Sequence, residues 1–423
     1  MKNLQLKKGV IIVKSSGRFL KGFLRWALIS AIIGCVGGFI GTGFHLAVGG
    51  ANQIREAHPS LILLLPIGGL CIVGLYKLCS MFDNHGTDDI IEAVRTDEKI
   101  PFRTAPLIFV STVITHLLGG SAGREGAALQ LGGSIGYQVG KIFRLDLKDR
   151  HLVVMCGMSA LFSALFGTPL TSAVFAMEVI SVGIMYYSGL IPCMFSALTA
   201  YGITCLFNIE PTKYTLSAVP DLGVIPLLQT VVIAMLCAGL SVLFCILLHG
   251  TAHGLQRILK NPYLRIAVGG AVIVGMTYLV RCTDYNGAGG QIIERAIGGT
   301  VKPEAFALKM IFTAVTIGAG YKGGEIVPTF FVGATFGCLI GGLIGMAPGF
   351  GAAVGMIAMF CGMLNCPIAA IILSVEMFGQ QGLILFAAAA AVSYVLSGYY
   401  GLYRSQKIMY SKLRAEYINK NTR

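Results

Sequence analysis

Charged residues are scarce in this sequence. Asp, Glu, Lys and Arg make up only 12% of the 423 residues, whereas 55% are hydrophobic. A soluble domain carries about 25% charged residues, so a chain that faces water over its whole surface is excluded. Three long stretches, 179–209, 222–256 and 326–375, contain no charged residue. Because a spanning helix needs about 20 apolar residues, these stretches predict an α-helical integral membrane protein.

Other expected signals are also missing. Short alternating segments of a membrane β-barrel are not seen. The 12 cysteines include no CxxC spacing and most lie in apolar runs, so they are interpreted as packing residues. The seven histidines have no metal-ligand spacing, and no metal or other cofactor is expected.

Glycine, in contrast, is abundant, with 56 residues. Together with the lengths of the apolar runs and the interrupting prolines, it predicts an all-α bundle of roughly 12 to 18 helical segments, many short or broken.

Basic residues gather at the two ends of the chain. Residues 1–25 contain seven Lys or Arg and no acid, and the segment from Arg404 onward contains six against Glu416 alone. Basic flanks of membrane segments stay cytoplasmic, so residues 1–22 and 404–423 are predicted to lie there. This distribution accounts for the net charge of +13 without nucleic acid as a partner.

The chain repeats itself at an offset near 200. Gly120, Gly123, Glu125 and Gly133 recur at 320, 323, 325 and 333, and Cys-Gly-Met at 156–158 recurs at 361–363. The order is the same in both halves, which predicts membrane repeats over 23–185 and 186–403. Duplicated units with interrupted helices are typical of transporters whose site lies where the repeats meet.

The first chemical motif is Gly123-Arg124-Glu125-Gly126. Glycines free the backbone to turn, and a helix is predicted over 127–139. Unpaired N–H groups at a helix start attract anions, so the start of this helix is predicted to bind one. Glu125 at membrane depth is a candidate gate, because its carboxylate competes with an anion for the same place. The alternative is a surface pair between Arg124 and Glu125.

The second motif is Gly323-Gly324-Glu325-Ile326-Val327-Pro328. Pro328 suits a first helical turn, so a second helix start is predicted here, and its unpaired N–H groups can face the first helix start. Glu325 beside an anion makes sense if protons also move. The alternative is an ordinary acid at a helix start.

Four further polar residues stand at candidate positions, and two of them have two interpretations each. His85, within Asn84–Asp89, could donate to an anion or be an ordinary loop histidine. Tyr403 could offer its hydroxyl to an anion or lie in an aromatic belt. Glu178 and Glu376 each follow a proline by nine residues and are interpreted as polar helix-end anchors.

These motifs resemble the CLC family of chloride channels and anion/proton antiporters, over about residues 23–412. The Gly123–Gly126 motif looks like the family's gating-glutamate motif. Gly323–Pro328 looks like its second anion-binding motif, and Tyr403 stands where the family has a pore tyrosine. The resemblance implies a homodimer with one anion path per subunit and inverted repeats. It also implies a bundle of about 17–18 helices in which Glu125 is the external gating and proton-transfer residue. The residues it implies along the anion path are those with N–H groups at the two helix starts and the tyrosine hydroxyl: Gly126, Ala127, Glu325, Ile326 and Tyr403. Arg124 and Val327, beside these groups, are expected to bind the anion as well.

The subtype follows from departures within the resemblance. His85 aligns with the serine of chloride-type members, and Val179 replaces the internal proton-transfer acid of chloride/proton antiporters. Glu325 resembles the acid of the fluoride-exporting branch, whereas Val327 does not match the hydroxyl residue found in some of its members. We therefore expect a fluoride/proton antiporter of the bacterial inner membrane.

Two alternatives remain. A chloride channel or chloride/proton exchanger of the same fold would differ in its ratio of chloride to fluoride flux. An intramembrane enzyme with Glu125 and Glu325 as paired acids would need a nucleophile or metal ligands, which the spacing does not supply. An enzyme is therefore not expected.

Overall fold

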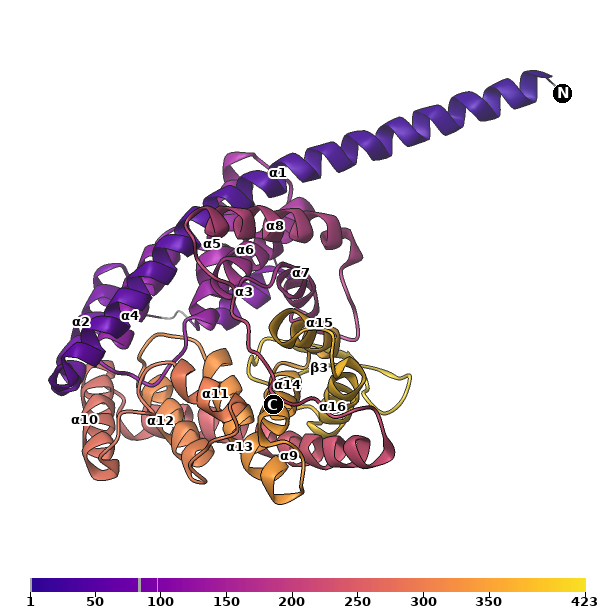
Figure 1. Ribbon diagram of the computed structural model, residues 1–423. Helices are drawn as coiled ribbons and strands as arrows, with labels where there is room; N and C mark the ends of the chain where they lie inside the picture. The colour runs from indigo at the N-terminus through magenta and orange to yellow at the C-terminus, as the bar shows by residue number, and fades with distance from the viewer. Residues whose placement is uncertain (1, 83–84, 97) are drawn as a thin grey trace.

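The chain folds into a helical bundle from which the first helix projects (Figure 1). The computed structural model describes residues 2–82, 85–96 and 98–423, and in the first helix it describes side chains from Gly17 onward. Asn84, in the predicted first-loop motif, lies outside the described residues. Seven helices are long and apolar enough to cross a membrane, within the part of the chain that is described. The prediction of an all-α, multi-pass membrane protein is confirmed.

The first half of the chain forms eight α-helices in its described part. Some of them are much longer or shorter than a single membrane span, which fits the expectation of uneven helices. The helices are α1 (Lys2–Ala57), α2 (Leu65–Leu78), α3 (Thr87–Ala93), α4 (Thr104–Leu117), α5 (Glu125–Ile142), α6 (Leu147–Phe166), α7 (Pro169–Glu178) and α8 (Leu190–Leu206), with 3₁₀ turns η1 (Pro59–Leu64) and η2 (Tyr187–Gly189).

The second half forms eight more. They occupy the lower part of Figure 1, below the first half. The helices are α9 (Val224–Ile258), α10 (Pro262–Val280), α11 (Gly290–Ile297), α12 (Ala305–Ala319), α13 (Ile326–Leu343), α14 (Pro348–Leu364), α15 (Pro367–Phe378) and α16 (Leu383–Leu396).

Three consecutive helices of the two halves repeat at the same shift. The starts of α4, α5 and α6, at positions 104, 125 and 147, correspond to the starts of α12, α13 and α14, at positions 305, 326 and 348. This shift is one position longer than the predicted one, which matched Glu125 with Glu325 by residue type. Gly123 instead pairs with Gly324, so Arg124 is the counterpart of Glu325. The two acids therefore occupy different positions in their repeats.

Helix packing also bears on where the repeats divide. Helix α8 packs against α1, α6 and α7, all of the first half. Helix α8 thus belongs with the first half by its packing, while the predicted boundary at residue 186 stays a prediction. A division between α8 and α9 gives each half eight α-helices among the described residues.

Glycines allow the central helices of each half to touch. A β-carbon on Gly157 of α6 would collide with the carbonyl oxygen of Gly132 in α5, and one on Gly355 of α14 would collide with that of Gly333 in α13. Side chains at these positions would push the helices apart. The helix pair that carries each site loop is therefore held by direct backbone contact.

Two glutamates cap each other's helices. Glu178, at the end of α7, accepts hydrogen bonds of 3.1 and 2.8 Å from the backbone N–H groups of Ile368 and Ala369, at the start of α15. Glu376 in α15 accepts bonds of 3.0 and 2.8 Å from Leu170 and Thr171, at the start of α7. A carboxylate at a helix N-terminus satisfies free donors and offsets the helix dipole. The interpretation of both acids as helix-end anchors is confirmed.

A small sheet near the end of the chain was not expected from sequence. Strand β2 (Lys407–Tyr410) pairs in parallel with β1 (Ser181–Val182) and antiparallel with β3 (Tyr417–Asn421). The terminal strand brings Thr422 to the Tyr403 loop, where its hydroxyl donates to the Tyr403 carbonyl at 2.6 Å. The predicted segment 404–423 is thus packed against the bundle and holds the loop that carries Tyr403.

Candidate anion site

The two glycine-rich loops meet through their backbones. Gly123 N–H donates to the Gly324 carbonyl at 2.6 Å, and Gly324 N–H donates to the Gly123 carbonyl at 2.7 Å. Directly after this bridge α5 begins at Glu125 and α13 begins at Ile326. Two helix starts from opposite halves therefore converge on one point, as the motifs predict.

The converging helix starts have no side-chain cap. Arg124 and Glu325 are the N-cap residues of α5 and α13, and neither makes a side-chain cap hydrogen bond within the described residues. The first N–H groups of each helix have no partner within their own helix. Gly126 and Ala127 in α5, and Ile326 and Val327 in α13, carry such groups beside the bridge. This arrangement offers an anion backbone donors and the positive ends of two helix dipoles.

Glu125 folds back over its own helix start. Its side chain is 3% exposed, its Oε2 accepts a 2.9 Å hydrogen bond from Arg124 N–H, and its Oε1 lies 3.5 Å from Arg124 Nε. A β-carbon on Gly123 would lie 2.8 Å from Glu125 Oε2, so the carboxylate lies directly over that glycine. The two residues do pair, but not at the surface as the alternative supposed, because the carboxylate is buried.

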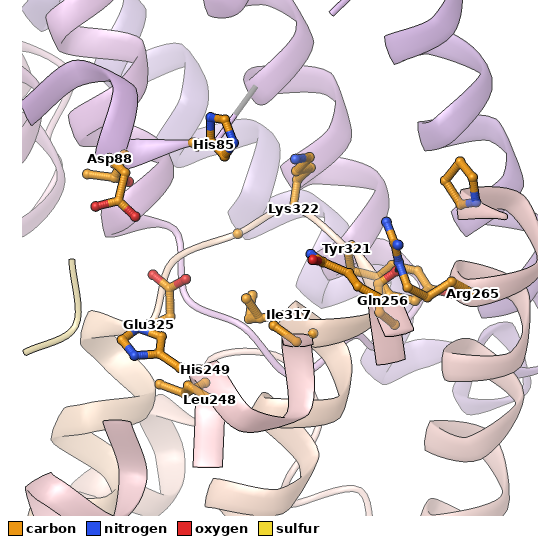
Figure 2. A pocket seen from close by; sticks show the side chains of 18 of the residues that line it. His85, Asp88, Leu248, His249, Gln256, Arg265, Ile317, Tyr321, Lys322 and Glu325 are labelled. Atoms are coloured by element: carbon orange, nitrogen blue, oxygen red, sulfur yellow. Dashed lines mark hydrogen bonds between the residues drawn. The ribbon is translucent and has the colours of Figure 1, made fainter. Parts of the chain in front are cut away.

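Glu325 lies on the other side of the bridge. A β-carbon on Gly126 would be 3.2 Å from Glu325 Oε2 and 3.7 Å from Glu325 N, so its carboxylate contacts the start of α5. Glu325 also lines a cavity of about 620 Å³. Figure 2 shows the carboxylates of Glu325 and Asp88 facing the same part of this cavity. Two acids, Glu125 and Glu325, thus flank the point where the helix starts meet.

Two side chains predicted from sequence share this cavity. Tyr403 is buried and its hydroxyl has no hydrogen-bond partner among the described residues. His85 lines the cavity but its side chain is 77% exposed and its Nδ1 lies 3.2 Å from Asp89 Oδ1. His85 therefore lies at the rim of the cavity, with a carboxylate beside it, while Tyr403 is buried in the wall.

Thr87 and Gln130 are among the residues of the cavity wall that sequence reasoning missed. Thr87 donates to the Gly126 carbonyl at 3.1 Å and accepts from Gln130 Nε2 at 3.2 Å. Gln130 is buried, and its Oε1 has no partner within the described part of the chain. Gln130 is a polar residue inside the predicted helix 127–139, a signal that could have been followed. Thr87 could not be found in this way, because its role depends on a contact 39 residues away.

The fold and the site together define a class. The chain is a multi-pass membrane protein of two inverted halves, whose broken helices meet at a backbone-lined site flanked by two acids, of which Glu125 is buried. This is the architecture of an ion transport protein. Residues 68–398 match the family model described as voltage gated chloride channel, and the chain belongs to that family, which confirms the CLC resemblance.

Known relatives extend over most of the chain. It is 33% identical over 400 residues to a chloride/fluoride channel protein of Pseudomonas syringae pv. tomato, covering 92% of this chain and 87% of the relative. It is 26% identical over 391 residues to an H(+)/Cl(-) exchange transporter of Vibrio parahaemolyticus, covering 85% and 83%. Among solved structures, a CLC-type fluoride/proton antiporter superposes with a TM-score of 0.88 at 31% identity, covering 90% of this chain and 98% of that one.

Proposed function

We propose that this protein exports fluoride in exchange for protons across the bacterial inner membrane. The observation that carries the proposal is the placement of Glu125 and Glu325 on either side of the Gly123–Gly324 bridge. A purely anion-conducting path gains nothing from two acids beside its binding groups, whereas a coupled path needs protonatable groups there. The similarity to a fluoride/proton antiporter over 90% of the chain supports the same assignment.

The anion is held by donors alone. Fluoride is small and strongly hydrated, so close N–H and O–H donors must replace its water. The N–H groups of Gly126, Ala127, Ile326 and Val327, with the hydroxyl of Tyr403 that has no partner among the described residues, are the donors that the proposal assigns to this task. His85, at the cavity rim, would be a further donor to an anion at the mouth of the path.

Protons move on the two carboxylates. A deprotonated Glu125 lies over the start of α5 and excludes an anion from it, held by Arg124. A protonated Glu125 has no charge to hold it there and leaves, which admits fluoride. Glu325, at the wall of the larger cavity, exchanges protons with the water in that cavity. Alternation of these states moves protons one way and fluoride the other.

The test is coupled flux in liposomes. Purified protein should release fluoride from loaded vesicles and take up protons at the same time. Glu125→Gln should abolish proton uptake, because a glutamine amide does not take up a proton in water near neutral pH. The fold of this variant should be unchanged. Lys141→Gln, at the end of α5, is a matched control and should leave both fluxes unchanged. Fluoride flux without proton uptake in the unaltered protein would reject the antiporter.

A chloride channel or chloride/proton exchanger is the second candidate. It is favoured by the departure at Val327 and by the similarity to an H(+)/Cl(-) exchange transporter. The ratio of fluoride to chloride flux at equal concentrations separates the candidates. Equal or greater chloride flux would replace the fluoride assignment.

Orientation and assembly are part of the proposal. Arg18, Lys21 and Arg25 at the start of the first membrane span favour a cytoplasmic N-terminus, as do the basic residues after Tyr403 for the C-terminal segment. A homodimer follows from the family resemblance. Protease access to tags at each end, and the mass of the detergent-solubilised particle, test these two points.

A further inference from the structure

A second cavity lies away from the first. It has a volume of about 270 Å³ and is lined by the end of α1, the loop 283–289 and the start of α11. It shares no lining residue with the larger cavity among the described residues. Helix α12 passes both cavities and gives their separation. Ile317, near its end, lines the larger cavity, and Lys309 lies beside the smaller one. The two residues are about two turns apart, roughly 12 Å along the helix.

Arg55 forms one wall of this second cavity. Its side chain is 16% exposed and its Nη1 donates to the His116 carbonyl at 3.2 Å. A β-carbon on Gly119 would lie 3.6 Å from Arg55 Cδ, and one on Gly287 would collide with the guanidinium. The guanidinium is therefore fixed between a loop of the first half and a loop of the second.

A second cation lies behind the cavity wall. Lys309 is fully buried, and its Nζ donates to the carbonyls of Tyr285 at 3.2 Å and Gly287 at 2.6 Å. Its Nζ lies 5.2 Å from the centre of the Phe331 ring. All these partners are neutral, so none of them cancels the charge of Lys309. A buried cation whose contacts are all neutral is costly, so the amine either loses its proton or is stabilised by a nearby anion.

The acids around the cavity do not reverse this charge. Asp284 lines the cavity but pairs with Arg295 at 3.2 Å and Lys302 at 3.0 Å. Glu56 lies 3.6 Å from Arg55 and is 54% exposed, so water screens it. Among these described residues, Arg55 and Glu56 carry opposite charges, and Arg295 and Lys302 together exceed Asp284 by one positive charge. Lys309 adds a second positive charge when it carries its proton.

The backbone adds to this field. Helix α11, eight residues long, starts at the cavity, and its first residues Gly290, Gln291 and Ile292 line it. Its N-cap is Gly289, with φ at 83°, and its first turn contains no acid. A helix start of this kind attracts an anion. This helix start supports the argument from the charges of Arg55 and Lys309, and the two arguments are independent of each other.

The cavity is joined to the site loop. Asn286 Nδ2 donates to the Gly119 carbonyl at 2.9 Å, and Gly287 N–H donates to the Gly120 carbonyl at 3.1 Å. Gly119 lines the cavity, and five residues after Gly120 the same loop reaches Glu125. The positive cavity therefore lies at the base of the segment that carries the gating acid.

We propose that this cavity is a capture site for a hydrated small inorganic anion, formed by Arg55, Lys309 and the start of α11. The anion is held there before it exchanges with Glu125. A single water needs only about 10–15 Å³ of such volume, so an anion fits with part of its hydration shell. The inference rests on the proposed anion transport but not on its selectivity.

The experiment compares fluoride flux from the two faces of the membrane. Vesicles with the protein in one orientation are supplied with fluoride first at the membrane face on which this cavity lies, called the cavity side, and then at the opposite face. Arg55→Gln should raise the half-saturating fluoride concentration about threefold or more on the cavity side. This is the effect expected from removal of one positive charge that lies about 7 Å from the anion in a water-like dielectric. The maximal rate should be unchanged, and the other side should keep its wild-type value.

A second variant pair guards against misfolding. Gln291 is exposed at the cavity lip, so substitution there removes no buried contact. Gln291→Glu should raise the half-saturating concentration on the cavity side and Gln291→Lys should lower it. Arg257→Gln, an exposed arginine at the end of α9, is the control and should change neither side.

Two results would overturn the inference. One is an unchanged half-saturating concentration in all three cavity variants, and the other is an equal change from both sides. In either case the unaltered protein still transports fluoride with protons, so failure of the capture site is distinguished from failure of the proposed function.

Discussion

Replacement of Gly324 by alanine tests whether the backbone bridge is needed for transport. A β-carbon there would fall closest to the Gly126 amide nitrogen and lie 3.0 Å from Gly126 Cα and 3.1 Å from Glu125 N. Ordinary contact begins at 3.4 Å, so the two loops must separate by a few tenths of an ångström, and by more at the amide. The φ angle of Gly324 is not positive, so alanine is strained only by this collision.

The expected loss can be worked from that collision. Overpacking a tight contact costs about 1–3 kcal/mol. At about 1.4 kcal/mol per tenfold change, the bridged arrangement should be populated about 5- to 150-fold less. The hydrogen bonds at 2.6 and 2.7 Å between Gly123 and Gly324 would lengthen or break, and the two helix starts would no longer face one anion.

The assay is the initial rate of fluoride efflux from proteoliposomes, with protein content matched. Gly324→Ala should lower the rate at least about fivefold. Gly275→Ala, in α10, meets nothing within 4 Å and should transport at the wild-type rate. A folded Gly324→Ala protein that transports as fast as the control would refute the role given to the bridge.

Three further predictions concern single side chains. Tyr403→Phe should raise the half-saturating fluoride concentration about fivefold, because it removes one donor worth about 1 kcal/mol, measured by the same flux assay. Glu376→Gln should lower the stability of the solubilised protein by about 1–2 kcal/mol in thermal unfolding, because the charged cap on α7 is lost. Asp284→Asn should destabilise at neutral pH but not in strong acid. Burial acts to raise the pKa of Asp284, but hydrogen bonds from Lys302 and Cys282 and nearby positive charges lower it overall, so its stabilisation is lost as the pH falls through that lowered pKa.

Each of these has a matched control. Tyr399→Phe removes a hydroxyl that bonds Ser411 rather than one that faces the cavity, and should keep wild-type flux. Glu304→Gln alters an N-cap acid with no side-chain cap bond among the described residues and should not shift unfolding. Asp221→Asn alters an exposed acid and should be neutral at every pH. A control that behaves like its partner would contradict the corresponding argument.

The sequence predicts the site better than the details of the repeat. Glycines around Glu125 and Glu325 and the proline at 328 mark local chain conformations, so both helix starts could be predicted from neighbouring residues. The correspondence of Arg124 with Glu325 could not be predicted in this way. The two glutamates, Glu125 and Glu325, are chemically identical and gave a more obvious match one position away. Pairing across the bridge, not residue type, decides it.

Long-range contacts explain the remaining gaps. The strand at 407–410 is short and depends on partners in the first half of the chain, at 181–182. Lys309 was invisible as a cavity cation, because a lysine in an apolar helix gives no sign of which loop carbonyls it reaches. The contact between Thr87 and Gly126 has the same character. Local patterns define helices, whereas such contacts are set only when the halves come together.

The reciprocal bonds of Glu178 and Glu376 have a consequence for assembly. Each carboxylate belongs to one half of the chain and satisfies the helix start of the other. A half made alone would expose two free donors in lipid and leave one carboxylate without its partners there, so neither half is complete by itself. Separately expressed halves should therefore accumulate only when both are produced in the same cell.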